Sequence, residues 1–107
     1  MLYQTNIEYV STNWIDDMGK VEIIFPRMPK IIELKITPKY FEAQRRGVKS
    51  FEIRKNDRGY RVDDVLWLEE YDPEKKQYTG HTLKRKITYI TSYKQQEGYV
   101  VLGTAPN

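Results

Sequence analysis

The sequence predicts a small, mostly β protein of the α+β class, a barrel or closed sheet with one main helix. Short segments in which apolar and polar residues alternate recur along the chain, and turn-forming residues separate them. Residues 38–46 have instead the start and stop signals of a helix. The chain has 107 residues, and 39% of them are hydrophobic. A chain of this length has room for one core but not for a second.

The N-terminal part is expected to stand apart from the rest. Apolar residues occupy alternate positions in residues 20–25, and residues 3–10 form another expected strand. The segment between them, Asp16 to Gly19, is rich in turn residues. We therefore expect residues 1–30 to be an extension, a β-hairpin that packs on a main domain of residues 31–107.

The helix of the main domain has recognisable boundaries. Thr37 can cap free backbone N–H groups, and Pro38 suits the first helical position because its missing N–H has no partner there. Ile36 and Phe41 have the spacing of a hydrophobic staple. Gly47 follows the helix, where a left-handed backbone is common.

The other segments of the main domain are expected to be strands. They are residues 31–36, 50–55, 65–71, 82–93 and 99–102. In the second of them, Phe51 and Ile53 point to one face. Ser50, Glu52 and Arg54 point to the other. This strand therefore has one apolar and one polar face.

Charge is distributed unevenly along the chain. The net charge is +3, but Lys35 to Arg61 holds nine Lys or Arg against three acids, a balance of +6. Residues 1–34 sum to −2, and residues 62–107 sum to −1. A local basic patch is what a polyanionic partner would need. A solvated helix face would carry the same charges, so charge alone leaves both interpretations open.

Several function classes are excluded or not expected. The chain has no cysteine, which excludes disulfides, a thiol nucleophile and a cysteine-based zinc site. His81 has no ligand-type neighbours, and the members of the pairs Asp63-Asp64 and Glu69-Glu70 point in opposite directions on a strand. We expect no metal and no cofactor. The chain shows no signal-peptide pattern and no apolar run of about 20 residues, so we expect a cytoplasmic protein without a membrane partner.

The segment from Gly47 to Arg54 is the most informative part of the chain. Glu52 and Arg54 share a strand face, and Lys49 enters from the loop just before it. An acid between two bases can hold both, which leaves their other N–H donors for an anion or a carbonyl. By spacing alone, an ordinary polar strand face with surface pairs worth ~0–1 kcal/mol each is the simpler interpretation.

A family resemblance adds to this. Gly47-x-Lys49-x-x-Glu52-x-Arg54 resembles the G-x-K-x-x-E-x-R signature of the ASCH domain family, within the PUA-like superfamily, and in particular a bacterial and phage branch of unknown function. The other matching segments are Leu34–Phe41, Lys55–Arg58, Glu70–Pro73, Tyr89–Thr91 and Gly98–Leu102. The resemblance implies a small β-barrel with a helix near one end. It also implies a cleft, lined by the signature residues, that binds RNA or a nucleobase-like ligand.

Some relatives in that superfamily are enzymes. One group removes the acyl group of N4-acetylcytidine with a lysine, a threonine nucleophile and a distant glutamate, and another is linked to RNA cleavage. Lys49 matches the lysine, but Glu52 stands in place of the threonine. Residues 93–99 form only a short loop where the insertion with the glutamate would be. A carboxylate does not replace an activated hydroxyl in acyl transfer, so the resemblance favours recognition over hydrolysis.

The sequence thus predicts a binding module for single-stranded RNA or a nucleoside-like ligand. The expected binding residues are Lys49, Glu52, Arg54, Arg58, Tyr60 and Arg46. Tyr60 is the expected stacking residue, Trp67 is expected in the core, and Lys84-Arg85-Lys86 could extend a phosphate track.

Two alternatives to this binding module stay open. One is a hydrolase of modified nucleosides or RNA, with Glu52 as general base and Lys49 stabilising negative charge. The other is a protein-interaction domain that uses the basic helix of residues 38–46 as its surface.

Overall fold

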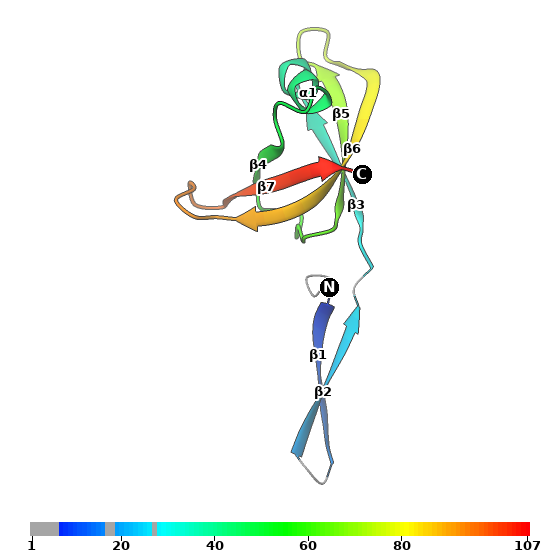
Figure 1. Ribbon diagram of the computed structural model, residues 1–107, viewed down its shortest axis with the longest axis vertical. Helices are drawn as coiled ribbons and strands as arrows, with labels where there is room; N and C mark the ends of the chain where they lie inside the picture. Colours follow the sequence, from blue (N-terminus) through cyan, green and yellow to red (C-terminus); the bar gives the residue numbers. More distant parts are fainter. Residues whose placement is uncertain (1–6, 17–18, 27) are drawn as a thin grey trace.

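The computed structural model describes residues 7–16, 19–26 and 28–107, with side chains from residue 28 onward. Strands β1 (Ile7–Asp16) and β2 (Gly19–Pro26) pair antiparallel and form a two-stranded sheet of their own (Figure 1). Residues 3–6 of the first expected strand lie outside the described residues, and β1 continues beyond residue 10. The predicted packing of this hairpin on the main domain stays a prediction.

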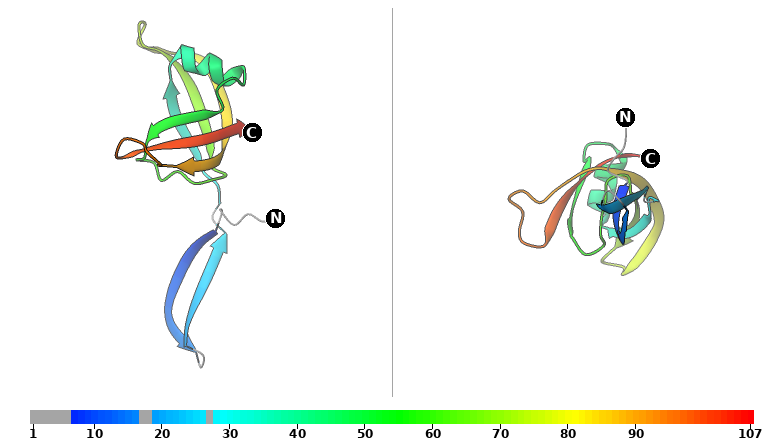
Figure 2. Two further views of the ribbon diagram at one scale, coloured as in Figure 1. Left: turned by 60° about the vertical axis from the view of Figure 1, so that its left-hand side comes forward. Right: turned by 90° about the horizontal axis from the view of Figure 1, so that it is seen from below.

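The main domain is a five-stranded sheet that curls around its own core (Figures 1 and 2). Its strands are β3 (Ile31–Ile36), β4 (Phe51–Lys55), β5 (Val65–Asp72), β6 (Gln77–Thr91) and β7 (Tyr99–Pro106). The spatial order is β3-β5-β6-β7-β4, in which β3 and β5 are parallel and all other neighbours antiparallel. Helix α1 (Pro38–Arg45) connects β3 to β4. The prediction of a mostly β fold with one main helix is confirmed.

Two strands are longer than their hydrophobic patterns indicate. Strand β6 starts at Gln77, because its first residues pair with the end of β5 across a short polar turn. Strand β7 runs to Pro106, because its last residues pair with β6. Ladder hydrogen bonds join backbone groups whatever the side chains are, so a hydrophobicity pattern does not report the polar ends of strands.

The core lies on the inner side of the curled sheet, under α1. Its buried apolar residues are Ile32, Leu34, Ile36, Phe41, Tyr60, Leu66, Leu68, Ile87, Val100 and Leu102. Ile36 and Phe41 are both buried on either side of the helix start, as the hydrophobic staple predicts. The Thr37 side chain makes no capping hydrogen bond, so that expectation is wrong. Gly47 has a φ of 79°, the left-handed backbone expected after the helix.

The curled sheet does not close with a β ladder. The two edge strands, β3 and β4, are not paired with each other, and we call the gap between them the seam. Arg54 Nη1 donates to the carbonyl oxygen of Lys35 at 3.0 Å, and Arg58 Nη1 donates to that of Glu33 at 3.2 Å. These carbonyls lie two residues apart on β3, so they point to the same edge of the strand. Two arginines therefore bridge the seam where backbone bonds are missing.

The helix content of the domain is small. Helix α1 has eight residues. In the part of the chain that the structure describes, no helix combines the length and the apolar character needed to cross a membrane.

Candidate functional site

A pocket of about 550 Å³ opens at the seam. It is lined by the end of β3, the start of α1 and the whole inner side of β4. The lining residues are Lys35, Ile36, Thr37, Tyr40, Lys49, Phe51, Glu52, Ile53 and Arg54. Three of the residues predicted from sequence, Lys49, Glu52 and Arg54, therefore meet in one pocket.

Glu52 is the centre of this pocket. It is only 3% exposed, and its two carboxylate oxygens face different cations. Lys49 Nζ lies 2.6 Å from Oε2, and Arg54 Nη2 lies 3.0 Å from Oε1. Arg54 Nε also donates to Oε1, at 3.2 Å. Burial of a carboxylate is costly unless it is paired and hydrogen-bonded, and both cations provide that here.

Two further polar residues, from α1 and β7, contact Glu52 or one another around it. Gln44 of α1 donates from Nε2 to Glu52 Oε2 at 2.8 Å and to the carbonyl oxygen of Phe51 at 3.1 Å. The same nitrogen lies 3.4 Å from the hydroxyl of Thr104 on β7. Both side chains are buried. We call Gln44, Lys49, Glu52, Arg54 and Thr104 the seam cluster.

Sequence reasoning did not identify Gln44 or Thr104. For Gln44 a signal was present, because it lies three residues after Phe41 and so faces the same side of the helix. Thr104 is 60 residues away from Gln44 in the chain, and no local pattern reports such a contact.

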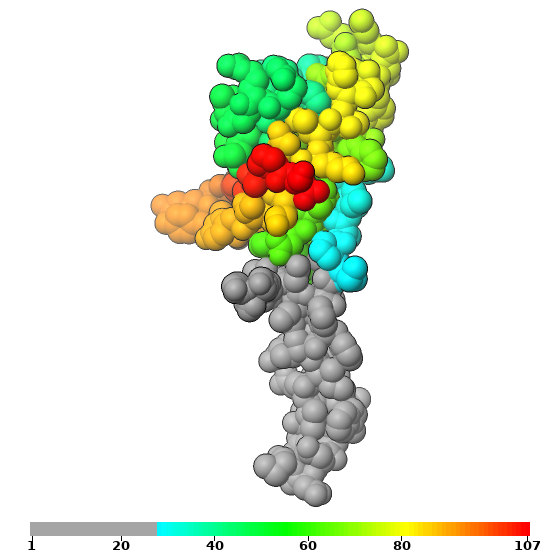
Figure 3. Space-filling model, turned by 45° about the vertical axis from the view of Figure 1, so that its right-hand side comes forward, coloured from blue at the N-terminus to red at the C-terminus, as the bar shows by residue number. Residues whose placement is uncertain are grey.

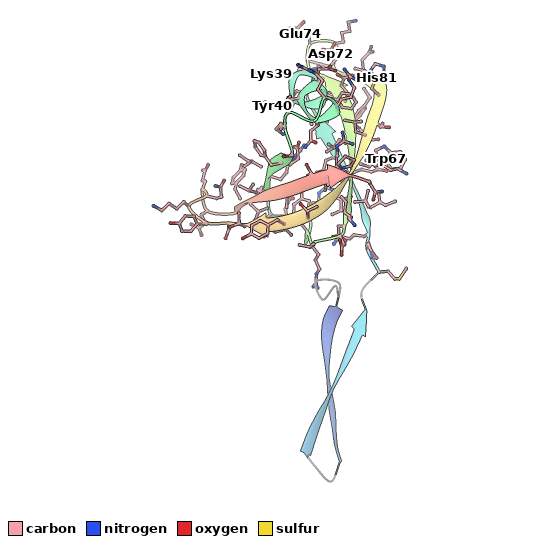
Figure 4. The ribbon with its side chains drawn as sticks, in the orientation of Figure 1. Lys39, Tyr40, Trp67, Asp72, Glu74 and His81 are labelled. Atoms are coloured by element: carbon pink, nitrogen blue, oxygen red, sulfur yellow. The ribbon has the colours of Figure 1, made fainter. Side chains whose placement is uncertain are left out.

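Aromatic rings flank the lysine of the cluster. Lys49 Nζ lies 5.2 Å from the ring centre of Tyr40 and 5.1 Å from that of Phe51. Both distances are within the range of a cation–π contact. Tyr40 projects from α1 (Figure 4), and Phe51 comes from β4. The pocket thus combines cations and a buried carboxylate with two ring surfaces.

Strand β4 corrects the simpler interpretation of its sequence. The alternation of its two faces is as predicted, but the polar face is the inner one. Phe51 is 40% exposed and Ile53 is 52% exposed, whereas Glu52 is buried. The idea of a solvated polar face with weak surface pairs is therefore wrong, because the polar side chains turn toward the seam and α1.

The other three predicted binding residues do not line the pocket. Tyr60 is 9% exposed and belongs to the core, and burial raises the pKa of its phenol. Its ring therefore exposes little surface to a ligand, and the expected stacking role stays a prediction. Arg58 is tied to β3 and lines a separate hollow beside Trp67. Arg46 is an exposed residue at the end of α1.

The basic run of β6 is also placed differently from its prediction. Lys84 Nζ lies 5.1 Å from the ring centre of Trp67, which is partly buried rather than a core residue. Arg85 donates to the carbonyl oxygen of Gln44 at 2.9 Å. Lys86 faces Asp63 at 3.7 Å. None of these three residues lines the seam pocket itself, and their role in a phosphate track beside it stays a prediction.

His81 is exposed and lies away from the pocket (Figure 4). Its Nδ1 is 3.0 Å from Glu70 Oε1, and its ring stacks near Phe41 with centres 6.3 Å apart. Among the side chains that the structure describes, from residue 28 onward, no group of three or more histidine, aspartate or glutamate residues could hold a metal ion.

Fold and site together define the class of protein: a small domain with a curled, incompletely closed sheet and a buried charged cluster at its seam. The chain belongs to the family described as a domain of unknown function (DUF3850), whose match covers residues 31–104. That range includes the whole seam cluster. The chain is also similar to an uncharacterized 12.9 kDa protein in the GpA 3′ region of Escherichia phage P2. The two are 38% identical over 76 residues, which cover 70% of this chain and 68% of the phage protein.

Proposed function

We propose that the seam pocket binds a nucleobase, within single-stranded RNA or as a free nucleoside-like ligand, and that the domain is an ASCH-like module of the PUA-like superfamily. The observation that supports this most is Glu52, buried at the floor of a pocket between Lys49 and Arg54. The pocket volume is within the usual range for small-ligand sites, about 300–1,000 Å³. The cytoplasm is the compartment in which we expect such a ligand.

The chemistry of the pocket suits a nucleobase with its phosphate. A lysine ammonium has three N–H donors, and among the described residues the Nζ of Lys49 donates to one side chain, Glu52. The remaining donors are available for a phosphate oxygen or a base carbonyl. Glu52 holds Lys49 and Arg54 in place at the pocket, and the rings of Tyr40 and Phe51 offer surfaces for stacking.

Recognition fits the cluster better than catalysis does. A general base must present a free oxygen to the proton that it removes. Glu52 already accepts hydrogen bonds from the side chains of Lys49, Arg54 and Gln44. We therefore propose that the carboxylate orients the two cations, which contact the ligand, and that it does not take up protons during turnover.

Binding measurements test the proposal directly. Titration of the protein with nucleoside monophosphates and with short single-stranded RNA should give saturable binding that weakens as salt rises. Lys49→Met should weaken binding about tenfold or more, because a charge-assisted hydrogen bond is lost. Lys75→Met is the matched control, since this lysine lies in the exposed turn between β5 and β6. Absence of binding at low salt, or an equal loss in both variants, would contradict the proposal.

A second assay separates binding from the hydrolase alternative. The protein is incubated with acylated nucleosides and with an RNA pool, and products are followed by mass spectrometry. We expect no turnover. Turnover that disappears in Glu52→Gln would replace our proposal with the enzyme.

A further inference from the structure

The outer face of strands β4, β7 and β6 is unusually apolar for an exposed surface. Outward positions on neighbouring strands are given by the residue pairs of the ladders. The apolar side chains on this face are Phe51, Ile53, Tyr89, Tyr99 and Val101. Tyr89 is 66% exposed, and Phe51, Ile53 and Tyr99 are exposed as well. We call these five residues the stacking face; the β6–β7 hairpin that carries part of it projects from the domain (Figure 3).

Gly103 leaves one outward position in the middle of this face without a side chain. Phe51 and Tyr89 both pair with Gly103, one from each side. A Cβ atom on Gly103 would approach Thr88 Oγ1 to 3.2 Å and Tyr89 Cβ to 3.3 Å, so a side chain is disfavoured there. The Cα atoms of Phe51 and Tyr89 therefore stand two strand spacings apart, about 10 Å, and the residue between them has no side chain. A flat ring that lies over Gly103 has an aromatic residue on either side.

Lysines predominate among the charges around the stacking face. The charged residues at outward positions of the three strands are Lys55, Lys84 and Lys86, and no outward position carries an acid. Asp63, from the loop before β5, lies 3.7 Å from Lys86 but leaves the others in excess. Lysine around aromatic rings suits a polyanion with flat rings. It does not suit a second copy of the same face, because self-association would bring lysine against lysine.

The stacking face is continuous with the seam pocket. Phe51 and Ile53 belong to the stacking face and also line the pocket. A single nucleic-acid strand whose base or phosphate is held by Lys49 and Arg54 can therefore continue over Phe51 while staying on the protein surface. The next ring along that direction is Tyr89, across Gly103.

We infer that the stacking face binds the bases of single-stranded nucleic acid that continues from the seam pocket. This inference rests on the proposed function, and it adds that the natural ligand is an oligonucleotide instead of a single nucleotide. The aromatic rings stack with bases, one base lies over Gly103, and the lysines contact the phosphates. Such stacking tolerates any base, so the face contributes affinity more than sequence selection.

The test compares a nucleoside monophosphate with a single-stranded RNA hexamer on the folded full chain. The hexamer should bind more tightly than the monophosphate, and Tyr89→Ala should weaken hexamer binding about tenfold, the effect of one lost stacking contact. Monophosphate binding, which reports on the pocket, should change less than twofold. Tyr89→Phe keeps the ring and should restore hexamer binding. Tyr78→Ala removes another exposed tyrosine outside the stacking face and is the matched control.

The outcomes separate the two proposals. If the monophosphate binds but hexamer affinity is unchanged in both Tyr89→Ala and Tyr99→Ala, the stacking face is refuted and the pocket stands. If neither ligand binds, both proposals fail. Vesicles of neutral lipid with one-fifth phosphatidylserine serve as the other polyanion. Tyr89-dependent binding to these vesicles without binding to the hexamer would overturn the nucleic-acid assignment.

Discussion

Strands β5 and β4 both alternate apolar and polar side chains, but they turn opposite sets toward the inside of the sheet. Strand β5 buries Leu66 and Leu68 completely. Strand β4 buries Glu52 and exposes Phe51 and Ile53. Strand β5 thus turns its apolar side chains to the core. Strand β4 turns its polar side chains inward instead, and it is the strand that lines the pocket.

The difference follows from the position of each strand in the sheet. Strand β5 has a neighbour on both sides, so its inner face meets only the core. Strand β4 is an edge strand, and its inner face meets the seam and Gln44 of α1. A buried ion pair often contributes no more stability than well-packed apolar residues of similar size would. Stability alone therefore gives little reason for Glu52, Lys49 and Arg54 to be there, which agrees with the ligand recognition that we propose.

The largest expected effect on stability concerns β5, the strand that buries its apolar face. Leu68→Ala should lower the free energy of unfolding by about 2–5 kcal/mol, because it removes buried methyl groups and leaves a cavity. The matched change on β4, Phe51→Ala, should lower the free energy of unfolding by only about 1 kcal/mol, since much of this ring is exposed. Urea denaturation followed by circular dichroism measures both. Equal losses would show that Phe51 is a core residue, and the contrast between the strands would not hold.

The next effect concerns the buried carboxylate. Glu52→Gln keeps the size of the side chain but places an amide against Lys49 and Arg54, so we expect a loss of about 1–3 kcal/mol in unfolding free energy. Glu42→Gln is the control, because Glu42 pairs with Arg45 on the exposed side of α1. Solvent screens that pair, and stability should stay within experimental error. If Glu52→Gln stabilises the protein, the cluster is maintained against stability, which strengthens the argument for function.

The smallest effect is confined to high pH. Burial raises the pKa of Tyr60 above the ordinary tyrosine value of 10.0, so the folded state holds the phenol proton more tightly than the unfolded state does. This contribution is fully present below the unfolded pKa and is lost as pH rises through the folded one. Stability should therefore fall more steeply above pH 10 in the natural protein than in Tyr60→Phe. Parallel curves of unfolding free energy against pH would mean that Tyr60 is accessible to water, as its prediction as a stacking residue required.

Local patterns predicted much of the main domain. The helix of residues 38–45, the left-handed Gly47 and the alternation of β4 each depend on a few consecutive residues, so the sequence reports them. The sequence also predicted that Lys49, Glu52 and Arg54 lie together, because their spacing places them near one another. The placement of Tyr60 was not predicted, since a tyrosine near a turn can equally face a ligand or the core.

By itself, then, the sequence determined where the helix and most strands lie and which side chains share a strand face, because these follow from backbone geometry over a few residues. Only the tertiary structure decided which face of β4 is the inner one. That choice depends on the curl of the sheet, on Gln44 reaching across from α1 and on Arg54 bridging to β3. These contacts join β4 to two other elements, and they make the polar strand face the lining of a pocket while leaving the apolar face outside.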